Sequence, residues 1–210
     1  EERTDAPRDL IEVQETKRAP DGSKIQTTWR VSRNVTSDFP GELARRLHRE
    51  VVERSISQLP KPVQNPVRLG SFREICSLLD IRYGGKTAKA VHAALKSSVT
   101  ASIESRTTLY LKAKRRYFDD TFHLYDRVVV TGEPLPDGNI ADAVYVVLGS
   151  WYLENLNANY VAPLDFDYFR QLTGPVASRM YELLHHWFFI AMRNGRPLLE
   201  RRYSTLCAYF

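Results

Sequence analysis

The sequence predicts an α+β protein in which two short helices lead directly into a β-hairpin. The first helix is expected to begin at Ser71, whose hydroxyl can cap a helix N-terminus, and Glu74 three residues later completes a capping box. After a turn with two adjacent glycines, a second helix is expected over residues 86–98. Two β-rich runs follow, at residues 100–114 and 121–131. This order is typical of a winged helix-turn-helix, a fold that usually inserts its second helix into the major groove of DNA.

The N-terminal region predicts a β-hairpin followed by a long helix. Residues 8–33 contain two strand-like runs on either side of the turn sequence Pro20-Asp21-Gly22. Residues 42–59 place leucine, isoleucine and valine at helical spacing, which indicates an amphipathic helix. A proline-rich connector then ends that helix and leads into the helix-turn-helix.

The C-terminal third is expected to be mostly helical. The segments 143–148 and 198–203 each predict a strand. Helices are expected at residues 150–156, 165–172 and 175–192, and another begins near Ser204. We therefore divide the chain into three parts: an N-terminal β-hairpin and connector at residues 1–40, a first winged-helix domain at residues 41–149, and a linker helix with the start of a second, truncated winged-helix unit at residues 150–210.

Composition indicates an ordinary globular protein with a modest basic excess. Of the 210 residues, 43% are hydrophobic and 26% are charged, and the net charge is +5. The sequence has no run of about 18 apolar residues and no signal-peptide core, so we expect a cytoplasmic protein without a membrane partner. The two cysteines, Cys76 and Cys207, lie far apart and are expected to be free thiols.

The predicted second helix has one cationic face and one apolar face. At about 100° per residue its lysines gather on one side, and the larger apolar residues gather on the opposite side. Lysines in this position can neutralise DNA phosphates, and a threonine near the helix start can reach a phosphate or a base edge. The alternative is an ordinary solvated lysine face. The helix residues that we expect to contact DNA are Lys86, Thr87, Lys89 and Lys96.

The predicted hairpin carries a second basic cluster at its tip. A basic wing can lie along the DNA backbone or place an arginine in a minor groove. The alternative is a charged edge that prevents strand-to-strand aggregation, since Asp119 and Asp120 follow closely and offset part of the charge. The expected wing contacts are Lys112, Lys114, Arg115 and Arg116.

No motif in the chain indicates catalysis. The sequence Gly84-Gly85-Lys86-Thr87 resembles the end of a phosphate-binding loop, but Asp80 stands where that motif requires its first glycine. The five histidines lack the spacing of metal ligands, because the adjacent pair His185-His186 points to different sides of its helix. No serine lies in a nucleophile-elbow sequence. We therefore expect a protein that is not an enzyme and that uses no metal or cofactor.

Three segments of the chain resemble plasmid replication initiators of the replication initiator A type. They are Ser71-Phe72-Arg73-Glu74-Ile75-Cys76-Ser77-Leu78-Leu79 with the following Gly84-Gly85-Lys86-Thr87, residues 148–165, and residues 175–184. The resemblance as a whole covers roughly residues 29–210. The resemblance implies tandem winged-helix domains that bind repeated double-stranded DNA sequences at a plasmid origin. It also implies host replication proteins as partners, a homodimeric form, association with the nucleoid or plasmid, and a second recognition helix beyond Phe210.

Two other functions remain open at this level. A transcription repressor can use the same fold and would differ only in having no effect on replication. Alternatively, a winged helix can serve as a protein-interaction or dimerisation module, with the apolar helix at residues 180–191 as its docking surface.

Overall fold

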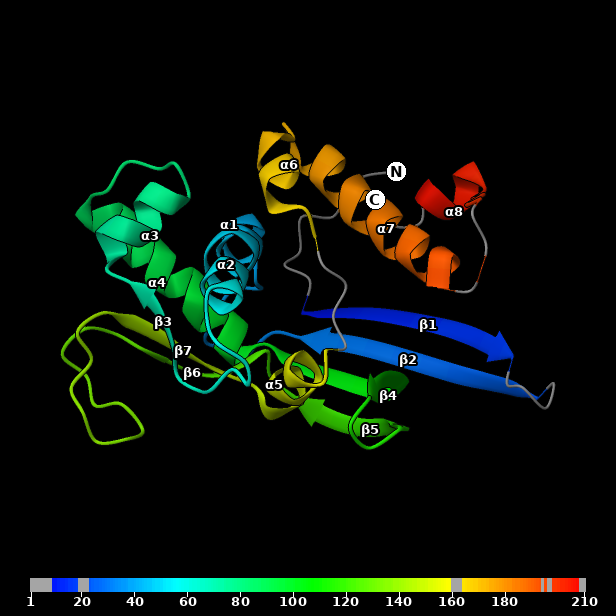
Figure 1. Cartoon of the computed structure of the whole chain (residues 1–210), viewed down its shortest axis with the longest axis horizontal. Coiled ribbons are helices and arrows are strands. Elements are labelled where there is room, and N and C mark those ends of the chain that lie inside the picture. Colours follow the sequence, from blue (N-terminus) through cyan, green and yellow to red (C-terminus); the bar gives the residue numbers. More distant parts are fainter. Residues whose placement is uncertain (1–8, 19–22, 160–163, 194, 196–197, 208–210) are drawn as a thin grey trace. The chain divides into compact units, whose positions relative to one another are not determined.

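The computed structural model describes residues 9–18, 23–159, 164–193, 195 and 198–207. It shows helices together with antiparallel sheets, so the predicted α+β class is confirmed (Figure 1). The chain forms two compact units, residues 1–160 and 161–210, each of which is described by itself. The boundaries predicted at 40/41 and 149/150 stay predictions. None of the described helices is both long enough and apolar enough to cross a bilayer.

The first sheet of unit 1 begins with the predicted N-terminal hairpin, which is confirmed, although its turn Pro20-Asp21-Gly22 lies outside the described residues. All neighbouring strands are antiparallel, in the order β1-β2-β4-β5. Val31 of β2 faces Ile103 of β4, so strands some 70 residues apart in the sequence lie side by side. The strands are β1 (Leu10–Arg18), β2 (Lys24–Ser32), β4 (Ser102–Leu111) and β5 (Arg116–Phe122).

A single long helix runs through residues 42–57, where the sequence predicted an amphipathic helix. Its middle is wound as a π-helix, so it is described as α1 (Glu42–Arg46), η1 (Leu47–Val52) and α2 (Glu53–Ser57). The apolar side chains at helical spacing are buried, namely Leu47, Val51, Val52 and Ile56. They form one wall of the hydrophobic core of unit 1.

The second sheet of unit 1 has the order β3-β7-β6 and packs with α3, α4 and α5. Its antiparallel strands are β3 (Val67–Gly70), β6 (Tyr125–Val129) and β7 (Val144–Leu148). The helices are α3 (Phe72–Leu78), α4 (Gly85–Thr100) and α5 (Ser150–Asn157). The predicted capping box is present: Ser71 Oγ accepts from the Glu74 amide at 3.2 Å, and the Ser71 amide donates to Glu74 Oε2 at 2.6 Å.

The hairpin expected directly after α4 differs from the structure. The predicted second run, residues 121–131, is divided: β5 ends at Phe122, and the chain crosses at His123-Leu124 into β6 of the other sheet. The hairpin that completes the three-stranded sheet is therefore β6–β7, joined by residues 130–143. The crossing is fixed by non-local hydrogen bonds that the strand pattern does not reveal, from the Trp151 indole to the His123 carbonyl and from the Gly149 amide to the Leu124 carbonyl.

The regular secondary structure of unit 2, within its described residues, consists of helices. Asp165 caps α6 (Phe166–Gln171) by accepting from the Tyr168 amide at 3.0 Å. The next helices are α7 (Pro175–Arg193) and α8 (Tyr203–Cys207). The strand predicted at residues 198–203 was wrong for the residues that the structure describes there, because 198–202 belong to no strand and α8 begins at Tyr203.

Candidate nucleic-acid interface

Helix α4 presents the two faces that its sequence predicts. Val91 and Leu95 are fully buried against the core of unit 1. Lys86, Lys89 and Lys96 are exposed on the other side. Burial of the apolar stripe fixes the rotation of the helix about its axis, so the lysines are held outward by packing rather than by contacts of their own.

The exposed face of α4 carries small side chains as well as cationic ones. Ala90 and Ala93 are exposed among the lysines, and Thr87 is half-buried near the helix start. At Gly84 and Gly85, which open the helix, an added Cβ atom would meet no atom within 4 Å. The first turn contains no acidic residue and no side-chain cap. Small residues let a duplex approach closely, and the uncapped amides of a helix N-terminus favour a phosphate group.

Ion pairing distinguishes α4 from the other charged helix of unit 1. In the helix at residues 42–57, Arg45, Arg46 and Arg49 each contact a carboxylate of their own helix, at 2.8, 2.7 and 2.7 Å. Among the described residues, Lys86 and Lys89 of α4 form no ion pair. Their charges are therefore available to an anionic partner, whereas the arginines are largely neutralised.

Two more basic residues flank the start of α4. Arg82 is exposed in the turn between α3 and α4, and the Arg73 guanidinium lies 5.2 Å from the centre of the Tyr83 ring. Sequence reasoning treated this segment only as a glycine-containing turn and did not assign these side chains. The available signal was the sequence Arg82-Tyr83 directly before the cationic helix, whereas the contact of Arg73 with Tyr83 depends on how α3 packs.

The second predicted cluster lies at the β4–β5 tip, which we define as residues 112–116. Its four cationic side chains are exposed: Lys112, Lys114, Arg115 and Arg116. Lys114 Nζ lies 3.6 Å from the Glu154 carboxylate of α5, which offsets part of its charge. The buried Asn155 accepts from the Lys112 amide at 3.2 Å and donates to the Tyr110 carbonyl at 3.1 Å.

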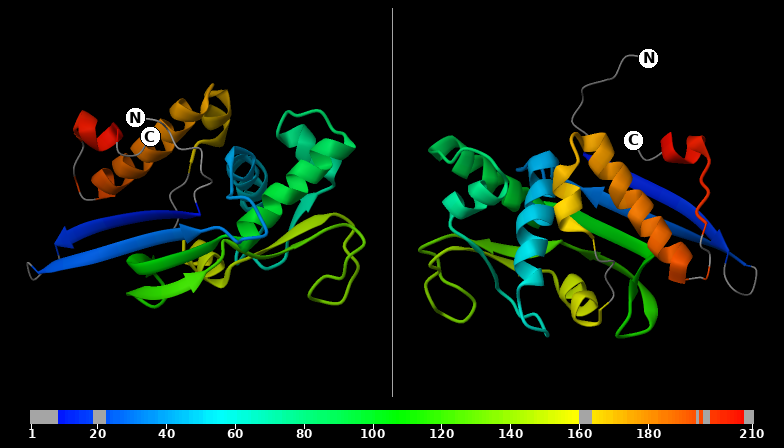
Figure 2. Two further views of the ribbon diagram at one scale, coloured as in Figure 1. Left: turned by 180° about the vertical axis from the view of Figure 1, so that it is seen from behind. Right: turned by 45° about the horizontal axis from the view of Figure 1, so that its top comes forward.

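The structure does not bring the two predicted clusters together. Strand β4 leads away from the C-terminal end of α4, so the β4–β5 tip and the start of α4 lie at opposite ends of unit 1 (Figures 1 and 2). The loop that lies at the same end as the start of α4 is the β6–β7 loop, residues 130–143. That loop contains three acidic residues and no lysine or arginine: Glu133, Asp137 and Asp142.

A partly buried polar network joins η1 and α2 to β6. His48 Nδ1 shares a hydrogen bond of 2.7 Å with the Tyr125 hydroxyl, and Arg49 donates to Glu53 at 2.7 Å. Burial opposes ionisation of Glu53, but hydrogen bonds and charges from His48 and Arg49 outweigh it and hold the pKa of Glu53 below its ordinary 4.5. Burial raises the pKa of Tyr125, so its hydroxyl stays protonated. We assign this network to stability, because its groups satisfy one another.

Residues 50–187, which include α3, α4 and the strands β3 to β7, match the family model described as replication initiator protein A. The chain belongs to the replication initiator protein A family. A crystal structure of selenomethionine derivatives of RctB domains 2 and 3 is similar to this family member over 97% of this chain and 77% of that chain, with 12% identity and a TM-score of 0.47. A second crystal structure of RctB domains 2–3 is similar over 94% and 68%, with 14% identity and a TM-score of 0.41. Comparison with curated proteins gives no match.

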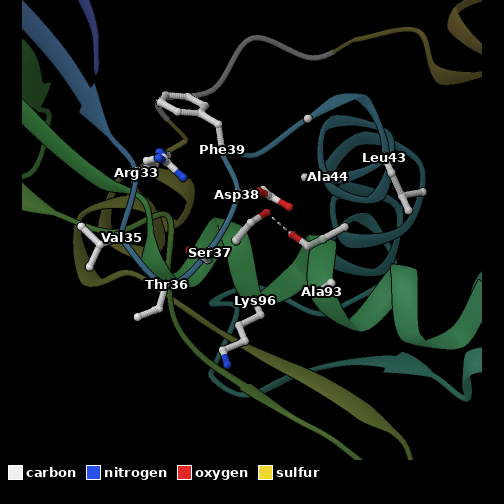
Figure 3. Close-up of a pocket in the computed structure, with 13 residues that line it drawn as sticks. Arg33, Val35, Thr36, Ser37, Asp38, Phe39, Leu43, Ala44, Ala93 and Lys96 are labelled. Atoms are coloured by element: carbon white, nitrogen blue, oxygen red, sulfur yellow. Dashed lines mark hydrogen bonds between the residues drawn. The ribbon is translucent and has the colours of Figure 1, made fainter. Parts of the chain in front are cut away.

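A cavity of this initiator-family chain borders the cationic helix. It has a volume of about 550 Å³ and lies between residues 33–41 and the second half of α4 (Figure 3). The Lys96 side chain points away from it, and the Ser97 hydroxyl donates to the Ala94 carbonyl at 2.8 Å. Among the described residues that line the cavity, Asp38 is the only carboxylate and none is histidine or cysteine. Nor do the described residues of the chain include three potential ligands placed to hold a metal ion.

Proposed function

We propose that this member of the replication initiator protein A family binds specific double-stranded DNA at a plasmid origin and thereby starts replication. Family membership supports the replication role. The observation that carries DNA binding is the exposed lysine face of α4, whose Lys86 and Lys89 lack carboxylate partners among the described residues. Such a face supplies an affinity that falls steeply with salt.

In this proposal the second sheet and its helices act as a winged helix. The order β3, α3, α4, β6, β7 is compatible with that fold, with α4 as the recognition helix and the β6–β7 loop in the position of the wing. Lys86, Lys89 and Lys96 contact phosphates, while Thr87 contacts a phosphate or a base edge. Because the β6–β7 loop has no cationic side chain, the phosphate contacts of this reader come mainly from α4 and its flanking arginines.

The proposed activity is binding and not catalysis. Origin DNA is the direct ligand, and host replication proteins and a second copy of the chain are the proposed partners. The proposed location is the cytoplasm, at the nucleoid or plasmid. Retention of all replication activity by a variant that cannot bind DNA would contradict this mechanism.

The test compares Lys86→Glu/Lys89→Glu with the wild type on origin duplex and shuffled duplex across a salt series. We expect the wild type to prefer origin DNA and the variant to lose roughly two units of the slope of log affinity against log salt, about one for each phosphate contact. Arg54→Glu/Lys61→Glu removes the same charge from the α2 region and is the matched control. Equal binding by wild type and α4 variant would overturn the proposal.

A replication readout separates an initiator from a repressor. The α4 variant is supplied in cells as the only source of the protein, and the copy number of a plasmid that carries the origin is measured. An initiator predicts loss of the plasmid. Unchanged plasmid copy number, together with lost DNA binding, would favour the repressor.

A further inference from the structure

We infer that the β4–β5 tip is a second contact for duplex DNA, located about one helical turn away from the base pairs read by α4. This inference rests on the proposed DNA binding by α4. The sequence placed the tip beside the recognition helix as its wing, whereas the structure places it at the opposite end of unit 1 (Figures 1 and 2). The cationic tip is therefore available to an anionic partner separately from α4.

The charge of the tip is concentrated and only partly neutralised. Four cationic side chains occupy five consecutive positions, and all are exposed. The ion pair between Lys114 and Glu154 is exposed and long, at 3.6 Å, so it screens one charge incompletely. Among the described residues, Lys112, Arg115 and Arg116 form no ion pair. A surface with this excess fits a polyanion better than it fits a protein of ordinary composition.

The tip is also held in one place, unlike an ordinary loop end. Asn155 in α5 is 5% exposed, and its side chain makes two hydrogen bonds to the backbone just before the turn, one with the Tyr110 carbonyl and one with the Lys112 amide. Two further backbone hydrogen bonds close the turn, from Lys114 to Leu111 at 3.1 Å and from Arg115 to Lys112 at 3.3 Å. A fixed backbone lowers the entropy cost of ordering the cationic side chains on a ligand.

The elements that separate the start of α4 from the tip are long on the scale of a turn of DNA. With 16 residues α4 is about 24 Å long. With 10 residues β4 adds about 33 Å as it leads away from the end of α4. One turn of duplex DNA spans about 34 Å. Because the start of α4 and the tip also lie at opposite ends of unit 1, we expect the tip to meet a duplex seated on α4 about one further turn away, outside the base pairs that α4 reads.

The contact at the tip is expected to be with the DNA backbone. Long, flexible lysine and arginine side chains on a turn give phosphate contacts that add affinity and fix orientation without reading sequence. The tip would then raise the affinity for a long duplex that contains the base pairs read by α4. It would not change the affinity for a short duplex that contains only those base pairs.

The experiment compares two duplexes that share one site obtained by in vitro selection from a random duplex library. The first is a core of roughly 14 base pairs, and the second extends the core by about two helical turns of unrelated sequence on each side. Lys112→Glu/Arg116→Glu is the tip variant, because neither position has a left-handed backbone. Arg54→Glu/Lys61→Glu is the matched charge control, and Lys112→Arg/Arg116→Lys preserves the charge of the tip.

We expect the tip variant to bind the long duplex on the order of tenfold more weakly than the wild type, with a salt slope lower by about two, and to bind the core duplex equally well. The charge-preserving variant should match the wild type on both. The α4 variant Lys86→Glu/Lys89→Glu should lose affinity on both duplexes. Failure of that last variant to weaken binding would refute the proposed function, independently of the tip.

Three outcomes would overturn the second contact itself. The tip variant could weaken both duplexes equally, which would place the tip within the core site. It could leave both unchanged, which would assign the tip to another role. A loss of the same size in Arg54→Glu/Lys61→Glu would show a general effect of net charge. Far-ultraviolet circular dichroism and the melting temperature establish that each variant is folded.

Discussion

Gly149 shows why one residue of the family-like string 148–165 must be small. A Cβ atom at this position would lie 2.5 Å from the His123 carbonyl oxygen and 3.1 Å from Trp151 Nε1. The Trp151 indole donates to that same oxygen at 3.0 Å, and the Gly149 amide donates to the Leu124 carbonyl at 3.1 Å. The backbone of Gly149 thus lies directly against the crossing between the two sheets.

Gly149→Ala should therefore destabilise unit 1 by about 1–3 kcal/mol, the usual cost of forcing extra volume into a packed site. The measurement is urea unfolding followed by circular dichroism. Gly85→Ala is the control, because a Cβ at Gly85, the first residue of α4, would meet nothing within 4 Å. Equal stability of the two variants would contradict the close approach at Gly149.

Glu53 makes the free energy of unfolding of unit 1 depend on pH in the acidic range. The pKa of Glu53 is lower in the folded chain than its ordinary 4.5, because His48 and Arg49 favour its charged form more than burial opposes it. Its stabilising effect is therefore present above pH 4.5 and is lost as the pH falls through the folded pKa. The side chain keeps 28% exposure, so solvent screens part of the attraction.

Glu53→Gln should lower the free energy of unfolding most above about pH 5.5, and the difference from wild type should narrow below about pH 4.5. Urea unfolding over this pH range measures it. Glu133→Gln, at an exposed position of the β6–β7 loop, is the control for loss of a carboxylate. A constant difference between Glu53→Gln and wild type at every pH would refute the linkage.

At the scale of elements, the local part of the fold was predictable, including the N-terminal hairpin, and the pairing of strands distant in sequence was not. The capping box at Ser71 and the two faces of α4 depend on residues three or four apart, so sequence alone indicates them. The partner of β4 is β2, which lies about 70 residues earlier, and no local pattern encodes that pairing. The end of β5 carries neither glycine nor proline, so residues 121–131 read as one strand.

The pairing of distant strands also explains why the predicted DNA-binding residues form two separate clusters and not one site. Lys86, Thr87, Lys89 and Lys96 were correctly placed on one helix, and helical periodicity gives the three lysines a common exposed side. The basic residues 112–116 were correctly placed on a turn between two strands, but the sheet that holds this turn is set by β2 and α5. A contact role for either group stays a prediction.

Helix α5 is expected to hold the β4–β5 tip through Asn155. Asn155→Ala removes both hydrogen bonds and leaves the Tyr110 carbonyl and the Lys112 amide without that partner, at a cost of about 1–3 kcal/mol. Amide hydrogen exchange should become faster at Lys112, while α4 keeps its protection. Glu154→Ala is the neighbouring control, since it removes only the exposed contact with Lys114. Unchanged exchange at Lys112 would show that the turn is held by other contacts.

At the scale of the whole molecule, the hydrophobic core determines what can fold by itself. All buried members of the core cluster, and the partly buried residues packed on it, lie between Leu43 and Leu156. The division of the chain into residues 1–160 and 161–210 leaves that cluster intact in the first unit. Since burial of a contiguous core is the main source of folding free energy, unit 1 holds what it needs to fold.

A fragment of residues 1–160 should therefore unfold in one cooperative transition. It should also keep salt-sensitive duplex binding that Lys86→Glu/Lys89→Glu abolishes, because the apolar face of α4 packs on the core of unit 1. Thermal unfolding followed by circular dichroism tests the first expectation, and fluorescence anisotropy with the selected duplex tests the second. The fragment that folds cooperatively but fails to bind would assign an essential DNA contact to residues 161–210. A fragment without a cooperative transition would instead show that the core of unit 1 depends on those residues for its stability.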